Sequence, residues 1–148
     1  MFKKVLLTLS LVGSFCLADM KDIEISNAYA KATPPNVKNS AIFMNIKNNT
    51  NKAIKLVGVE SSASQVAEIH THERVDGMMK MIQIDHIEIP AGAEVTLKPG
   101  GLHLMLINVS HPIKDGGIVD ATLKFDNSMT INLSNILAKH VMKQAHKH

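Results

Sequence analysis

Short apolar runs separated by turn residues follow one another along most of the chain. Apolar and polar residues alternate within many of these runs, which is typical of strands that bury one face. Pro, Gly, Asn and Asp separate the runs at spacings of about 8 to 12 residues, which predicts an antiparallel β-sandwich or barrel. We expect strands at 23–31, 41–46, 54–59, 66–72, 78–84, 87–89, 94–97, 102–109, 118–125 and 129–133.

The two ends of the chain depart from this pattern. Lys3 and Lys4 precede an apolar run that ends in Cys16-Leu17-Ala18, which indicates a cleaved secretory signal peptide. The apolar run is shorter than the roughly 18 to 20 residues that a membrane span needs. The last segment, 134–148, is the one part of the chain that could be helical, although its apolar pattern is thin. We therefore expect a signal peptide at 1–18, one β domain at 19–134 and a His- and Lys-rich tail at 135–148.

The only Cys of the chain, Cys16, lies inside this signal. It could carry a lipoprotein's lipid, but Phe15 stands before it where a small residue is expected. We therefore favour an exported protein without a stable membrane anchor. Its mature chain has no thiol, which excludes disulfides, thiolate catalysis, Cys-based zinc sites and a blue-copper electron-transfer site.

Cleavage after Ala18 also lowers the formal charge from +3 to +1, because Lys3 and Lys4 are lost and no acidic residue is. Two Phe, one Tyr and no Trp remain. A nearly neutral domain with so few aromatic side chains has neither the basic surface nor the stacking platforms of nucleic-acid binding proteins, so we expect no nucleic-acid partner.

All 8 His and 8 of the 9 Met remain after cleavage. A thioether is a soft, uncharged ligand that suits Cu(I), and imidazole accepts copper in either oxidation state. The strand 102–109 alternates so that His103 and Met105 share the face away from Leu104. The other interpretation of this pair is a surface histidine beside a methionine packed under a loop.

A second pair of strands supplies more His and Met. His70 and His72 share one face of 66–72, and Met79 and Met81 share one face of 78–84. The Asp76-Gly77 turn between the strands predicts a hairpin that brings the two faces together. Taken alone, each methionine of this hairpin is better explained by filling of the core, which is the usual role of Met.

His70, Met81, His103 and Met105 form the pattern H-x10-M-x21-H-x-M. This spacing, together with Ile87-Glu88-Ile89-Pro90-Ala91-Gly92 and Leu97-Lys98-Pro99-Gly100-Gly101, resembles the periplasmic PCu(A)C copper chaperones over 23–133. Two features depart from that family. Tyr29-Ala30-Lys31 replaces the usual aromatic-Ala-Arg, and His72 adds an imidazole.

The resemblance implies a cupredoxin-like β-barrel with an exposed Cu(I) site made by the two His and two Met. It also implies a periplasmic, non-enzymatic role in delivering copper to the binuclear copper centre of cytochrome oxidase, often beside a thioredoxin-like copper chaperone. We expect a monomer. His72 and Met79, together with His140, Met142, His146 and His148 in the tail, are candidates for secondary metal binding, with Cu(II) considered for the tail.

Two other functions remain open at this stage. A periplasmic copper buffer or resistance protein would have the same site. A zinc metallohydrolase could use His70, His72 and His103 with Glu68 or Glu73 as the base. That enzyme would leave Met81 and Met105 without a purpose, and the chain has no His-Glu-x-x-His segment.

Overall fold

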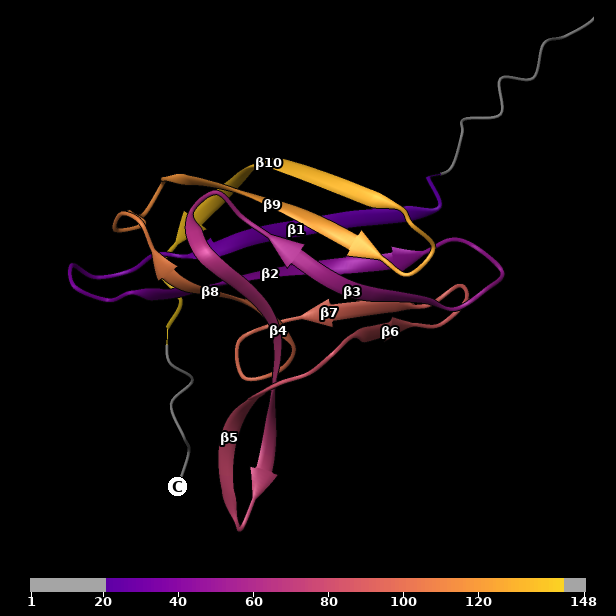
Figure 1. The fold of residues 1–148 in the computed structure, drawn as a ribbon, viewed down its shortest axis with the longest axis horizontal. Coiled ribbons are helices and arrows are strands. Elements are labelled where there is room, and N and C mark those ends of the chain that lie inside the picture. Colours follow the sequence, from indigo (N-terminus) through magenta and orange to yellow (C-terminus); the bar gives the residue numbers. More distant parts are fainter. Residues whose placement is uncertain (1–20, 143–148) are drawn as a thin grey trace, which may run out of the picture.

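The protein folds as an all-β structure (Figure 1), seen here in a computed structural model that describes residues 21–142. This confirms the predicted fold class, whereas the predicted signal peptide lies outside the described residues. No described segment forms a helix of the length and apolarity that a bilayer crossing requires. The strands are β1 (Ile23–Lys31), β2 (Asn39–Asn48), β3 (Ile54–Glu60), β4 (Ser64–Val75), β5 (Met78–Gln83), β6 (Ile87–Ile89), β7 (Glu94–Leu97), β8 (His103–Val109), β9 (Ile118–Phe125) and β10 (Thr130–Lys139).

The strands join into one sheet in the order β5-β4-β8-β2-β1-β10-β9-β3-β6. Within the described part of the chain, β1 and β10 pair in parallel, and the other pairs are antiparallel. The first half of β2 pairs with β8 and its second half pairs with β7, so the sheet divides at β2. The sheet curves around a single apolar core and forms a β-sandwich.

The core is built by the alternation of side chains across the pleat. Leu104 and Leu106 of β8 are fully buried, as are Ile42, Met44 and Ile46 of β2. Burial of each such side chain is worth about 1.5–3 kcal/mol. The site-bearing strand β8 is thus held in a fixed register by its leucines, since a slip by one residue would turn them out of the core.

The β4–β5 hairpin extends beyond this core (Figure 1). Ile69 is the last residue of β4 that belongs to the core, and β5 contributes no residue to it among those described. The turn residues Asp76 and Gly77 have φ values of 50° and 77°. Positive φ at both central positions is the requirement of a type I′ hairpin turn, as the Asp-Gly pair predicts.

At the carboxyl-terminal end of the domain the structure has strand where the sequence pattern had left a helix open. Residues 134–139 form strand rather than helix, and β10 continues past the expected domain boundary at 134 to Lys139. Leu137 pairs with Tyr29 of β1, while Ile136 and Ala138 are buried in the core. The pairing joins strands from opposite ends of the domain, a long-range contact that the local pattern does not reveal.

Candidate metal centre

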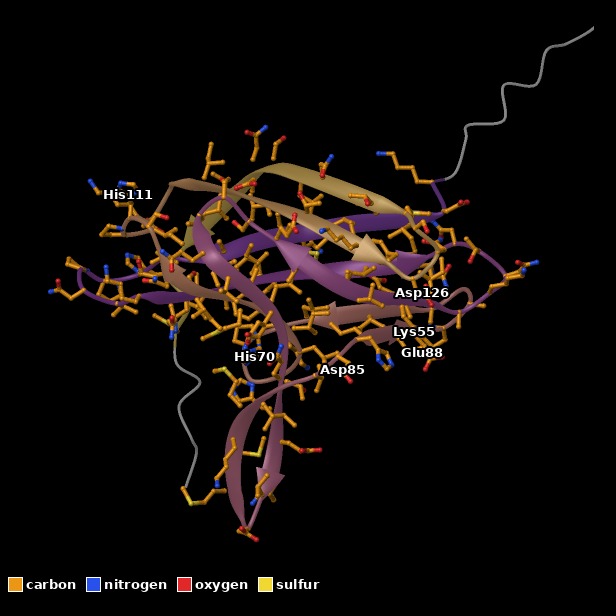
Figure 2. The ribbon with its side chains drawn as sticks, in the orientation of Figure 1. Lys55, His70, Asp85, Glu88, His111 and Asp126 are labelled. Atoms are coloured by element: carbon orange, nitrogen blue, oxygen red, sulfur yellow. The ribbon has the colours of Figure 1, made fainter. Side chains whose placement is uncertain are left out.

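Strand register brings the four motif residues onto one face of the sheet. His70 of β4 lies opposite His103 of β8, and Met105 lies opposite Glu68 two positions further along. Met81 of β5 reaches the same face from the other side of β4, where it lies opposite His72. Figure 2 shows His70 near the point where the hairpin leaves the body of the sheet. Three strands therefore contribute to one cluster on the face away from the leucines.

Met81 lies directly opposite His72 and is therefore nearer to His72 than to the motif histidine His70. The Ile84 amide donates to the Ile69 carbonyl at 2.9 Å, which makes this pair a hydrogen-bonded one. Since hydrogen-bonded and non-hydrogen-bonded pairs alternate, His72 and Met81 form a non-hydrogen-bonded pair, in which side chains approach most closely. Met81 is then a diagonal neighbour of His70, two residue pairs along the ladder.

His103 is buried and is not the surface histidine of the alternative interpretation. Its side chain is only 3% exposed, although it points away from the leucine core. The rings of His70 and His72 lie with centroids 5.8 and 5.3 Å from that of His103, and Phe43 of β2 lies at 6.3 Å. The aromatic neighbours therefore form a small second layer over this part of the sheet.

One backbone carbonyl fixes the tautomer of His103. Its Nδ1–H donates to the Gly101 carbonyl oxygen at 2.9 Å, which leaves the Nε2 lone pair free. Burial lowers the pKa of the His103 imidazole, and the nearby His72 and His70 lower it further, while the bond to Gly101 opposes them. Its imidazole is therefore held in the neutral form that a metal requires.

His70 contains an unsatisfied buried atom. Its Nε2 lies 2.7 Å from the Glu68 carboxylate, while its Nδ1 is buried and has no hydrogen-bond partner. Buried polar atoms in native proteins are nearly always hydrogen-bonded. The unpaired Nδ1 of His70, whose ring neighbours that of His103, is an exception that a binding partner would explain. A bound metal ion would be such a partner.

The methionines form the open side of the cluster. Met81 is 45% exposed, whereas Met105 is partly buried. Met79 lies on the same face as Met81, opposite Arg74, while the exposed Met78 lies on the other face of β5. Within residues 21–142, no three His, Asp or Glu side chains are arranged so that they could hold a metal ion on their own.

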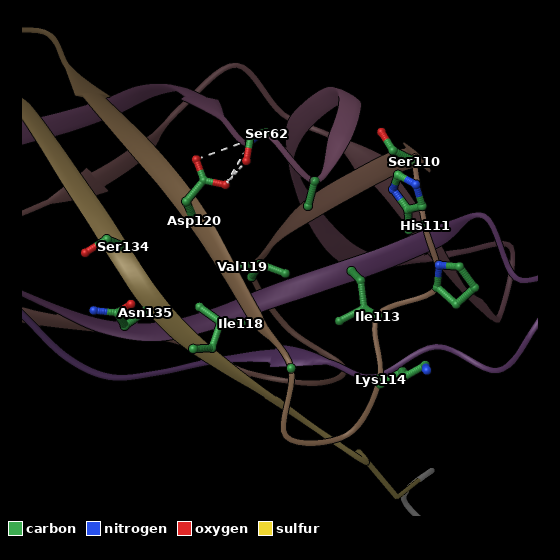
Figure 3. A pocket seen from close by; sticks show the side chains of 13 residues that line it. Ser62, Ser110, His111, Ile113, Lys114, Ile118, Val119, Asp120, Ser134 and Asn135 are labelled. Atoms are coloured by element: carbon green, nitrogen blue, oxygen red, sulfur yellow. Dashed lines mark hydrogen bonds between the residues drawn. The ribbon is translucent and has the colours of Figure 1, made fainter.

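The other histidines of the described residues, and the tail candidate Met142, take part in none of the contacts given above. His86 and His111 are exposed, and Figure 2 shows His111 well apart from His70. His111 lines a groove of about 550 Å³ that contains none of the motif residues (Figure 3). In the tail, His140 and Met142 are exposed beyond β10, and the His140 amide donates to Asp115 at 3.2 Å. His146 and His148 lie outside the described residues.

Sequence reasoning assigned no supporting role at the cluster to three groups: Glu68, which it considered only as a hydrolase base, the Gly101 carbonyl and Phe43. Glu68 carried a usable signal, because it stands two residues before His70 and therefore shares its face. The Gly101 carbonyl and Phe43 gave none, since a backbone acceptor and a ring from β2 are placed by tertiary pairing.

Comparisons with known proteins bear on the family. The sequence profile of the family described as "Putative lipoprotein LpqE-like" matches residues 23–135. The chain is 30% identical over 109 residues to "Putative lipoprotein Lxx21020" of Leifsonia xyli subsp. xyli, covering 73% of this chain and 64% of that protein. It is 31% identical over 93 residues to "Uncharacterized protein RP573" of Rickettsia prowazekii, covering 62% and 51%. The chain thus spans less than two thirds of the length of these relatives.

Solved structures bear on the fold. The "Copper-bound PCuAC domain from PmoF2" aligns with a TM-score of 0.67 at 21% identity, covering 80% of this chain and 94% of that one. Apo-DR1885 from Deinococcus radiodurans aligns with a TM-score of 0.64 at 29% identity, covering 84% and 83%. The fold is thus the cupredoxin-like β-sandwich of PCuAC domains, and with the profile match over 23–135 the chain belongs to the LpqE-like family of PCuAC-type proteins.

Proposed function

We propose that the protein is a Cu(I) chaperone that holds the ion with His70, Met81, His103 and Met105. The observation that carries the proposal is the register of β4, β5 and β8, which brings two imidazoles and two thioethers to one face. The unpaired Nδ1 of His70 and the free Nε2 of His103 add two lone pairs. A solved structure titled as CuI-DR1885, 29% identical to this chain, supports the same ion.

The donor set suits copper as a cargo. Thioethers bind Cu(I) and bind zinc, calcium and magnesium poorly, so the mixed set is selective for a soft ion. The buried imidazole of His103 and the exposed thioether of Met81 give the site a closed and an open side. An acceptor protein can therefore approach from the methionine side and replace a thioether before the histidines release the ion.

The biological setting is part of the proposal. We infer export to the periplasm as a monomer without enzymatic activity, with copper passed to the copper-centre subunit of cytochrome oxidase. A thioredoxin-like copper chaperone is the expected companion. The apolar segment before Ala18 and the lipoprotein names of the family and of one relative support export.

The structure weakens the zinc hydrolase alternative. Glu73, one of the two acidic residues considered as a base, lies on the face of β4 opposite to His70 and His72. Glu68 already contacts His70, and so is engaged with a candidate ligand. The copper buffer alternative shares the proposed site and differs only in what happens to the ion.

Met81→Leu and Met105→Leu test the ligand set. Leucine keeps the volume and apolarity, so the melting temperature of the metal-free protein should change little. Cu(I) affinity, measured by competition with a chromogenic chelator, should fall at least about tenfold for each variant. Met78→Leu is the matched control, because Met78 is exposed on the other face of β5. Unchanged affinity in the double variant, or zinc binding tighter than Cu(I), would overturn the proposal.

The lowered pKa of His103 predicts how stability depends on pH. As pH falls through about 6.5, the unfolded chain gains a proton that native His103 resists, so the free energy of unfolding of the metal-free protein decreases. His103→Gln removes this contribution, so its stability should fall less between about pH 7.5 and 5 in urea titrations. His111→Gln, in an exposed loop, is the control. Equal losses for wild type and His103→Gln would contradict the burial effect.

Deletion of the gene from its host separates chaperone from buffer. A chaperone is needed when copper is scarce, so cytochrome oxidase activity should fall at limiting copper and recover when copper is added. Complementation with the Met81→Leu/Met105→Leu form should fail to restore it. A deletion that only lowers tolerance to excess copper, with oxidase activity unchanged, would favour the buffer or resistance role.

The tail is proposed as a weaker second site that takes Cu(II) through His140, His146 and His148, with Met142 beside them. Lys139, Lys143 and Lys147 oppose tight binding of a cation. Because β10 runs to Lys139, the test is truncation after this residue, which keeps the buried Ala138. The truncated protein should keep one Cu(I) and lose Cu(II) binding. Undiminished Cu(II) binding would show that the tail is not a site.

A further inference from the structure

Glu68 is a charged side chain that no part of the four-residue motif accounts for. It lies on the same face of β4 as His70, opposite Met105 of β8. Its carboxylate contacts His70 Nε2 at 2.7 Å, and the side chains of His70 and Glu68 are 13% and 26% exposed. The contact is thus made at the edge of the proposed copper site and is partly shielded from water.

This contact determines which nitrogen of His70 is available. An ionised carboxylate only accepts hydrogen bonds, so a neutral His70 beside it carries its proton on Nε2. The lone pair then resides on Nδ1, which is buried and without a partner. His103 shows the reverse arrangement, since its Nδ1–H donates to Gly101 and its lone pair is on Nε2.

We propose that Glu68 is a positioning residue of the copper site, which directs His70 to bind the ion through Nδ1 while His103 binds through Nε2. The inference rests on the proposed Cu(I) function. Histidines that bind metals commonly donate their second ring N–H to a carboxylate or carbonyl, which fixes the ring and strengthens its donor atom. Here Glu68 serves one histidine and Gly101 serves the other.

Glu68 also supplies charge. Two imidazoles and two thioethers are neutral, so the ion they hold has a net charge of +1, which is costly to keep in a partly buried site. The carboxylate beside His70 offsets this charge without binding the ion. Arg74 is the arginine on the same face of β4. Its guanidinium donates a hydrogen bond to the Gly77 carbonyl at 3.2 Å, near the tip of the hairpin.

Glu68→Gln is the test variant, because it keeps the shape of the side chain but can donate as well as accept. Glu73→Gln is its matched control, since Glu73 is exposed on the opposite face of the same strand. ¹⁵N NMR of the metal-free proteins, at a pH where imidazoles are neutral, reads the tautomer of His70 directly. We expect the Nε2–H form in wild type and in Glu73→Gln, and a mixture of tautomers in Glu68→Gln.

Cu(I) competition titrations of the same samples complete the test. Glu68→Gln should lose about 10- to 100-fold in affinity, the usual effect of mutating a residue that hydrogen-bonds a metal ligand, and Glu73→Gln should match wild type. Glu68→Ala should lose at least as much. Wild-type affinity in Glu68→Gln, or an Nδ1–H tautomer of His70 in the wild-type protein, would overturn the inference. Failure of wild type itself to bind Cu(I) would overturn the proposed function, and is seen before any variant is compared.

Discussion

Alternation of side chains across strand β8 is the constraint on which both the core and the candidate site depend. Leu104 and Leu106 are fully buried on one face, which places His103 and Met105 on the other. A slip by one residue would expose the leucines and turn His103 and Met105 into the core at the same time. The free energy that fixes the fold therefore also fixes where two of the four proposed ligands stand.

The two other proposed ligands, His70 and Met81, come from a hairpin that the core holds at one end only. Ile69 anchors β4, and beyond it β4 and β5 extend from the body of the sheet (Figure 1). The histidine side of the cluster is thus packed against Phe43 and the sheet, while the thioether of Met81 faces solvent. For the proposed cargo role this division is useful, because one side would keep the ion and the other would let an acceptor reach it.

Local pattern was sufficient for most of the fold, because the strands and the Asp76-Gly77 turn follow from alternation and turn chemistry. The four motif residues were singled out by the resemblance of their spacing to the PCu(A)C pattern, since local pattern alone left core filling open for the methionines. What local pattern could not supply are contacts between distant strands. The parallel pairing that extends β10 beyond 134, the direct opposition of His72 and Met81, and the placement of buried His103 beside Phe43 all depend on strand order and register.

X-ray absorption spectroscopy of the Cu(I)-loaded protein tests the central claim most directly, because it identifies the donor atoms around the ion. The account predicts that both sulfur and imidazole nitrogen scatter from the first shell of copper. It also predicts that the sulfur contribution falls when Met81 and Met105 are replaced by leucine. A first shell of nitrogen and oxygen alone, unchanged by those replacements, would contradict it.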